Sequence, residues 1–220
     1  MKINIRNCIL CLAIMALTTS CGDFWDGGDP VQARNMMLGR ESIDLMVGDS
    51  YRIPVLFDPE ELSNDGIWWT TDDSDIAIFV DDAVVGMSEG TTIAYAVSAV
   101  NRQEAECVVN VWPRWYSNPY NYPYDMVIYA NITLNGEPIG DDIYVGAFIF
   151  GELRGVAERL ERKGHKYTVI RIWSDSEFGE AIYFKHYDPK TATMVEHDLC
   201  IPFTLNSYGS PSYPIDIELN

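Results

Sequence analysis

Short apolar runs separated by turn residues constrain the fold of this chain more than any other feature of its sequence. Several runs alternate apolar with polar positions, as residues 215–219 (IDIEL) do, and they are interrupted by turn pairs such as Gly48-Asp49 and Asn135-Gly136. Alternation with a period of two, broken by turns of this kind, indicates β-strands joined in hairpins. Because no long stretch has helical periodicity, we predict an all-β fold.

Two groups of such runs predict two β-sandwich domains in tandem. The length of 220 residues suits two modest domains better than one. Residues 38–113 contain about seven runs of strand length between turns, which is the sequence signature of a β-sandwich. Residues 114–220 are again rich in such runs, and we predict a C-terminal β-sandwich there. The stretch 158–164 (ERLERKG) is highly charged, so we expect it to be a loop or brief turn.

The first of these domains carries several motifs of a known family. The motifs are residues 47–49 (VGD), 69–77 (WTTDDSDIA), 84–91 (VVGMSEGT) and 107–111 (CVVNV). In order and spacing they resemble the bacterial immunoglobulin-like domains of group 2, which occur in intimins, invasins and many surface proteins. The resemblance implies an immunoglobulin-like fold for residues 38–113, acting as a rigid extracellular spacer or adhesion module without a catalytic site. By the same resemblance Trp69 is a core residue, and Gly86 and Gly90 are turn glycines.

The C-terminal domain also carries motifs seen elsewhere. They include residues 134–137 (LNGE), 145–148 (VGAF) and 153–157 (LRGVA). These resemble a module that recurs at the C-terminus of secreted and surface proteins of bacteria, often beside immunoglobulin-like domains, and no activity follows from the resemblance. That family often has cysteine where this chain has Leu153, so a role of that thiol is not implied. We expect the adjacent Arg154 to form a structural ion pair.

Residues 1–20 have the pattern of a targeting segment. Two basic residues precede the apolar run 9–17 (ILCLAIMAL), which is too short to span a bilayer, and small residues then precede Cys21. This resembles the lipobox of bacterial lipoproteins, although Thr18 stands where leucine is usual. The resemblance implies a cleaved lipoprotein signal peptide and a lipid on Cys21, which would anchor the protein in the bacterial outer membrane, exposed at the surface. The alternative is an ordinary secretory signal followed by a chance cysteine.

Residues 21–37 are expected to form an acidic tether behind the lipid. Its first part (CGDFWDGGD) combines glycines with aspartates, a composition that keeps a segment flexible and solvated. Removal of residues 1–20 lowers the formal charge from −18 to −20, because Lys2 and Arg6 leave with no acid. An acidic surface of this size repels phosphates, so we expect no nucleic-acid partner.

An aromatic linker, residues 112–124 (WPRWYSNPYNYPY), joins the two predicted domains. Six of its residues are Trp or Tyr. The candidate ligand-binding residues among them are Trp115, Tyr116, Tyr120, Tyr122 and Tyr124. Rings with polar tips on a Pro-rich segment can stack on the faces of sugars. They can equally pack between the domains or over the end of a sandwich, and the cost of exposing so much apolar area favours packing.

Two cysteines accompany Cys21 once the signal is removed. Cys107 and Cys200 are far apart in the sequence and have no spacing that indicates a metal or redox site. They could pair across the two domains, but we expect each to be a buried free thiol. Cys107 shares one face of the run 105–111 (AECVVNV) with valines, which places it among core positions.

No motif in the sequence indicates catalysis or a cofactor. The three histidines, His165, His186 and His197, have no partner at metal-ligand spacing, and no nucleophile or phosphate-loop motif occurs. The acidic clusters 72–75 and 81–82 could coordinate calcium, but we favour solvated turns because the spacing of a calcium loop is absent. We therefore predict no metal, no cofactor and no enzyme activity.

Together these features predict a lipid-anchored surface protein that acts in adhesion or ligand recognition. Its partners would be the membrane, through the lipid on Cys21, and a host or matrix protein or a polysaccharide. The alternative is a glycan-binding accessory lipoprotein of a polysaccharide-uptake system, with the linker aromatics stacking on sugar. A structural subunit of a surface assembly is a third class, for which the sequence shows no donor strand.

Overall fold

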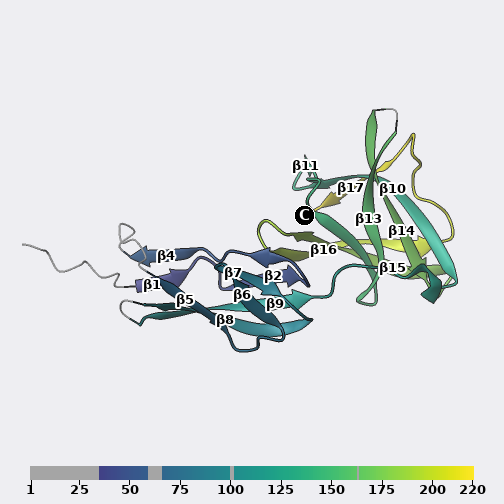
Figure 1. Cartoon of the computed structure of the whole chain (residues 1–220). Coiled ribbons are helices and arrows are strands. Elements are labelled where there is room, and N and C mark those ends of the chain that lie inside the picture. The colour runs from purple at the N-terminus through teal and green to yellow at the C-terminus, as the bar shows by residue number, and fades with distance from the viewer. Residues whose placement is uncertain (1–34, 59–65, 100–101, 163) are drawn as a thin grey trace, which may run out of the picture.

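The computed structural model of the chain is built almost entirely of β-strands, which confirms the predicted all-β class (Figure 1). It describes residues 35–58, 66–99, 102–162 and 164–220. The predicted signal peptide, Cys21 and most of the predicted tether lie outside the described residues. Within the described part, the one helix is the 3-10 turn η1 (Pro119–Asn121), and no helix is long and apolar enough to cross a membrane.

Nine strands form the first unit. They are β1 (Asn35–Leu38), β2 (Ser42–Met46), β3 (Ser50–Tyr51), β4 (Val55–Asp58), β5 (Ile67–Thr71), β6 (Ala77–Val80), β7 (Ala83–Gly86), β8 (Gly90–Ser98) and β9 (Glu104–Trp112). One sheet has the order β2-β9-β8-β5, with β2 parallel to β9, and a second has the order β3-β7-β6. β1 pairs with β4, so the strands begin at Asn35, three residues before the predicted domain boundary.

The core of the first unit follows the alternation of its strands. Cys107, Val109 and Val111 are buried on one face of β9. Trp69 packs against the core and stacks on Phe79 with 4.8 Å between the ring centroids, in keeping with the core role implied by the family resemblance. The acidic cluster 72–75 forms a turn in which the Asp73 carboxylate accepts a hydrogen bond from the main-chain N–H of Asp75 at 2.9 Å.

Eight strands form the second unit. They are β10 (Tyr124–Leu134), β11 (Glu137–Pro138), β12 (Tyr144–Ile149), β13 (Glu152–Arg162), β14 (His165–Ser174), β15 (Phe178–Asp188), β16 (Thr193–Thr204) and β17 (Ile215–Leu219). Their order is β11-β10-β14-β13-β12-β15-β16, with β17 parallel to β10. Because residues from both ends of this sheet pack into one apolar core, the sheet folds over on itself.

The fold in the sheet lies on β13. Residues 152–156 of this strand pair with β12, whereas residues 157–162 pair with β14. Gly155 lies at the change, and a Cβ atom there would be 2.4 Å from the carbonyl oxygen of Arg171. Only glycine permits this close approach of two backbones, so the bend depends on it.

The charged stretch 158–164 is not the loop or brief turn that its composition suggested. Residues 158–162 complete β13, and β14 starts at His165, so the stretch is the outer half of a hairpin. The guanidinium group of Arg159 donates to the carbonyl oxygens of Asp141 and Ile143 at 2.9 and 2.7 Å. These contacts with a segment earlier in the chain hold the β13–β14 hairpin in place. Local composition does not show such contacts, so it did not reveal that residues 158–162 form a strand.

The two cysteines do not pair. Both are free thiols, and Cys107 is fully buried in the first unit, as predicted. Cys200 is exposed, so the prediction that it is buried was wrong. Its neighbours on β16, Leu199 and Ile201, point toward the core, and the alternation of the strand therefore turns the Cys200 side chain outward.

A polar joint centred on Asp44 of β2 connects the two units. The main-chain N–H of Asp44 donates to the carbonyl oxygen of Ala192 at 2.8 Å, and its carboxylate accepts from the N–H of Met194 at 3.2 Å. The same carboxylate accepts from the indole of Trp112 at 3.0 Å. Ala192, in the turn between β15 and β16, is buried in the core of the first unit. The second unit therefore contacts the first through this turn.

Candidate functional site

The structure divides the five candidate ligand-binding residues of the linker into two groups. Trp115, Tyr122 and Tyr124 are half-buried, whereas the side chains of Tyr116 and Tyr120 are 77% and 94% exposed. The rings of Trp115 and Phe148 form a T-shaped contact with 5.5 Å between their centroids, and Tyr124 packs against the core of the second unit. Packing and exposure thus occur side by side in one segment.

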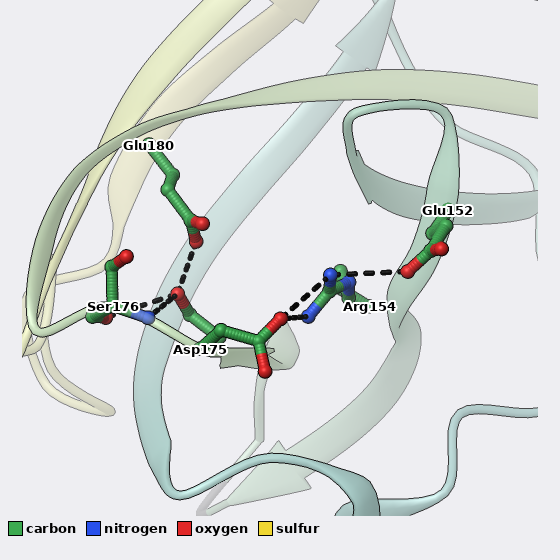
Figure 2. A network of polar contacts seen from close by, with 6 residues as sticks. Glu152, Arg154, Asp175, Ser176 and Glu180 are labelled. Atoms are coloured by element: carbon green, nitrogen blue, oxygen red, sulfur yellow. Dashed lines mark hydrogen bonds and ion pairs between the residues drawn. The ribbon is translucent and has the colours of Figure 1, made fainter.

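Tyr122 covers a buried arginine. The guanidinium carbon of Arg154 lies 3.9 Å from the centroid of the Tyr122 ring, and Arg154 as a whole is only 4% exposed. Its Nη2 atom is 3.0 Å from a carboxylate oxygen of Glu152, and its Nη1 atom is 3.1 Å from one of Asp175. Figure 2 shows Arg154 held between these two carboxylates, which confirms the expected ion pair. A buried arginine needs such partners to offset its desolvation.

The turn that carries Asp175 is itself braced by polar contacts. The hydroxyl of Ser174 accepts a hydrogen bond from the N–H of Ser176 at 3.0 Å and donates to the carboxylate of Glu180. The neighbouring Glu177 carboxylate raises the pKa of Tyr124, by its charge and by a hydrogen bond. The segment between β14 and β15 is therefore fixed on the linker and on β13 at once.

Three exposed aromatic rings project from the segments that meet at Arg154. Tyr120 lies two residues before Tyr122, Phe150 two residues before Glu152, and Phe178 three residues after Asp175. Phe150 and Phe178 are 82% and 75% exposed. We call Tyr120, Phe150 and Phe178 the distal rings. A chain advances at most about 3.5 Å per residue, so each ring's backbone lies within about 10 Å of the residue that ties its segment to Arg154.

One of the distal rings, Phe178, lies far from the joint between the units. β15 runs from Phe178 to Asp188, and the turn that follows it contacts β2. Eleven residues of strand, as β15 has, span about 30 Å. Phe178, the first residue of β15, therefore stands about that far from the joint.

Sequence reasoning found Tyr120 but missed Phe150 and Phe178. Phe150 and Gly151 form a two-residue link between β12 and β13, with positive φ angles of 51° and 80°. Such turns strongly favour Asn-Gly, so a phenylalanine in the first position is unusual. Phe178 had no comparable signal, since it reads as the first apolar residue of a strand.

A cavity lies beside the outer half of the β13–β14 hairpin. It has a volume of about 510 Å³, and Asn131, Asp141 and Arg159 are among its lining residues. Two of its polar groups are already engaged, since Asn131 donates to Asp216 at 3.0 Å and Arg159 donates to two carbonyl oxygens. The cavity therefore indicates no particular ligand. Across the described ranges, no group of three or more His, Cys, Asp or Glu side chains is placed to hold a metal ion.

Comparison with known proteins gives only distant likenesses. No family model matches the chain, and no curated protein does. Among solved structures, the chain is similar to domains 4–9 of the surface layer protein SbsC, with 13% identity and a TM-score of 0.33 over 84% of this chain and 32% of that one. It is similar to domains 5–6 of SbsC at 12% identity and a TM-score of 0.31, over 79% of this chain and 98% of that one.

A third likeness is to the PcdhgB3 EC1-4 structure, at 8% identity and a TM-score of 0.30, over 84% of this chain and 50% of that one. All of these are β-domain proteins, as this chain is. Likenesses at such identities and TM-scores carry no argument about activity, ligand or partner, so the function of this chain has to be argued from its own residues.

Proposed function

We propose that the chain is a non-catalytic surface lipoprotein, anchored by a lipid on Cys21, whose second unit recognises a protein ligand through the distal rings. The observation that carries this proposal is the exposure of Tyr120, Phe150 and Phe178 on three segments fastened together at Arg154. Aromatic side chains on a braced support are typical anchors of protein interfaces. Single exposed rings are ordinary, but three around one fixed point favour a binding surface.

The support beneath the rings favours recognition with little rearrangement. Arg154 connects the linker, β13 and the β14–β15 turn through one ring contact and two ion pairs. Because each of the three segments is held, the rings lose less conformational freedom on binding than rings on free loops would. The position of Phe178 about 30 Å from the joint suits a surface presented away from an anchor at Cys21.

The binding part of the proposal is tested by adherence. Full-length lipidated protein, carried on cells or on liposomes, would be scored for attachment to surfaces coated with collagen, fibronectin or laminin and to host-cell monolayers. A variant with Tyr120→Ser, Phe150→Asn and Phe178→Ser should lose at least about tenfold in attachment, since truncating one anchor ring costs about 1–2 kcal/mol. Trp68→Ser is the matched control, because Trp68 is an exposed aromatic on the first unit.

Unchanged attachment of the triple variant, measured with protein shown to be folded, would refute a role for the distal rings. Attachment that falls equally in Trp68→Ser would point to general surface hydrophobicity instead. The anchor is tested separately by mass spectrometry of the membrane fraction, in which the mature N-terminus should carry acyl chains on Cys21 and a Cys21→Ser variant should be released.

A second candidate function, glycan binding, rests on Tyr116 and Tyr120. Of the five candidate rings, these two remain free to stack on a sugar, because the other three pack within the protein. Soluble polysaccharides would then shift the fluorescence of the neighbouring Trp115, and Tyr116→Ser with Tyr120→Ser would abolish the shift without lowering the melting temperature. A polysaccharide response that needs Tyr116 but neither Phe150 nor Phe178 would favour this candidate over the first.

A further inference from the structure

The strands of the second unit form a fork near the tip of the β13–β14 hairpin. The last residue pair between β10 and β14 joins Ala130 to Thr168. Beyond that pair β10 continues beside β17 and β11, whereas β14 continues beside β13. The sheet therefore opens between residues 131–134 of β10 and residues 165–167 of β14.

A cavity of about 430 Å³ lies at this fork, and we call it the basic pocket. Its lining includes Asn131 of β10, then Arg162, His165 and Lys166 of the hairpin, and Ser212 of the loop before β17. Figure 1 shows this loop, in yellow, beside the hairpin. The volume falls within the range of about 300–1,000 Å³ that is usual for small-ligand sites.

The charge of the basic pocket is opposite to that of the chain as a whole. The sequence has 33 acidic and 15 basic residues, yet among the described residues no Asp or Glu lines this cavity. The ion pairs between described residues involve neither Arg162 nor Lys166. The acid opposite Lys166 in register is Glu161, which lines the adjoining cavity instead. Both cations are therefore available to an external anion.

The loop that forms one wall of the basic pocket is held in place by main-chain hydrogen bonds. Tyr208 donates to the carbonyl oxygen of Val127 at 3.0 Å and accepts from the N–H of Tyr129 at 2.9 Å. Ser210 and Tyr213 then exchange two main-chain hydrogen bonds of 3.0 Å, which close a turn. Because the loop is fastened to β10 and closed on itself, little ordering is needed when a ligand binds.

The side chains around the basic pocket suit a ligand that carries both an oxyanion and hydroxyl groups. Arg162 and Lys166 supply charged donors, which form strong hydrogen bonds to sulfate and carboxylate oxygens. The amide nitrogen of Asn131 donates to Asp216 at 3.0 Å, and this leaves the amide oxygen to accept from a hydroxyl. Tyr213 follows Ser212 and is 81% exposed, so its ring can contact the face of a sugar at the rim.

We propose that the basic pocket binds an acidic sugar unit of a polysaccharide, one that carries a sulfate or a carboxylate group. A broad anionic membrane surface is disfavoured, because the net charge of −18 repels it. A single sugar unit meets only the pocket, and exposed charges more than about 8 Å away are largely screened. An acidic peptide has the oxyanion but lacks the sugar face and the hydroxyls that Tyr213 and Asn131 suit.

The basic pocket is a separate site from the distal rings. The ten residues of β14, His165–Ser174, span about 30 Å between the pocket and the segment that carries Asp175. The inference therefore does not depend on the protein ligand proposed above, and substitutions at the two ends of β14 distinguish the two sites.

The first test measures binding of model polysaccharides to full-length lipidated protein on neutral liposomes by isothermal titration calorimetry. Dextran sulfate and polygalacturonate should bind, more weakly as the salt concentration rises, whereas unsulfated dextran should not. Arg162→Gln with Lys166→Gln should lower the affinity at least about tenfold, because hydrogen bonds to charged groups are lost. Arg52→Gln with Arg102→Gln is the matched control, since it removes two charges from exposed arginines of the first unit.

Three results of this test would overturn the proposal. They are binding of unsulfated dextran as tight as that of dextran sulfate, equally tight binding of polyglutamate, and an equal loss of affinity in the control variant. Because Arg162 and Lys166 are exposed, their replacement should leave the melting temperature unchanged, and circular dichroism checks that the variant is folded.

The second test separates contact with the sugar from attraction of the anion. Tyr213→Ser should weaken binding of dextran sulfate severalfold, while sodium sulfate alone should still shift the NMR signals of His165 as in the unaltered protein. Phe178→Ser is the matched control, because it removes an exposed ring at the other end of the second unit. Unchanged affinity for dextran sulfate in Tyr213→Ser would refute the sugar contact, and the absence of any sulfate shift at His165 would refute the anion site.

Discussion

Phe150 occupies a backbone conformation that its side chain disfavours, so replacing it with asparagine should stabilise the second unit. Phe150 and Gly151 have φ angles of 51° and 80°, the signature of a two-residue turn that requires positive φ in both positions. A left-handed conformation costs an ordinary residue roughly 1–2 kcal/mol, and asparagine tolerates it better than other non-glycine residues. Because the ring is 82% exposed, little packing is lost on its removal.

The expected gain is about 1 kcal/mol, which corresponds to a rise in melting temperature of about 2–4 °C for a chain of this size. The chain supplies the reciprocal experiment, since Asn135-Gly136 between β10 and β11 has nearly the same angles, 53° and 82°. Asn135→Phe should therefore lower the melting temperature by a similar amount. Both turns belong to the second unit, so both changes act on the same unfolding transition.

Thermal unfolding followed by far-ultraviolet circular dichroism, with urea unfolding to check that the dependence on denaturant is unchanged, would measure both effects. Phe150→Ala serves as a control, because it removes the ring without supplying the preference of asparagine for positive φ. A lower melting temperature in Phe150→Asn, or an equal rise in Phe150→Ala, would refute the reasoning from turn conformation. If the rise occurs while attachment falls, the phenylalanine is retained for binding at a cost in stability.

Three further predictions follow from contacts elsewhere in the chain. Asp44→Ala removes the acceptor for Trp112 and Met194 and should lower the free energy of unfolding by about 1–3 kcal/mol. Small-angle X-ray scattering should show a wider distribution of distances between the units, and unchanged scattering and stability would contradict the assigned joint. Gly155→Ala forces a Cβ atom against the Arg171 carbonyl and should lower the free energy of unfolding by about 3 kcal/mol in urea titrations, whereas Gly164→Ala, with no atom near its Cβ, should cost less. Cys200 should react with a maleimide in the folded protein, whereas Cys107 should react only after unfolding, because burial raises the pKa of its thiol to about 11. Labelling of both cysteines at equal rates would contradict the burial of Cys107.

Local patterns predicted the first unit well because its core is built from local alternation. The positions that alternate in residues 107–111 are the ones that are buried, and strand burial depends mainly on which face a side chain takes. Cys200 shows the limit of the same reasoning. A cysteine is usually buried, but its neighbours on β16 fix which face is inward, and the register of β16 is set by pairing with β15 rather than by its own composition.

The outer half of the β13–β14 hairpin could not be predicted for a related reason. Its residues are charged and exposed, so no apolar face marks them as strand. What holds them is pairing across the turn and the contacts of Arg159 with the carbonyl oxygens of Asp141 and Ile143. Interactions between segments that are distant in sequence leave no periodic signal, and a reading of local composition assigns such segments to loops.

The linker shows why composition alone could not choose between packing and binding. Both interpretations treated its five candidate rings as one set, yet whether each ring is packed or exposed depends on what lies opposite it. Trp115 finds Phe148 and Tyr122 finds Arg154, and both contacts come from strands of the second unit. Tyr120 lies on the 3-10 turn between Trp115 and Tyr122, and its ring is exposed to solvent. The packed residues on either side hold the turn in place and so fix the position of the exposed ring. The packed rings therefore position the exposed one, and packing supports recognition in this segment instead of competing with it.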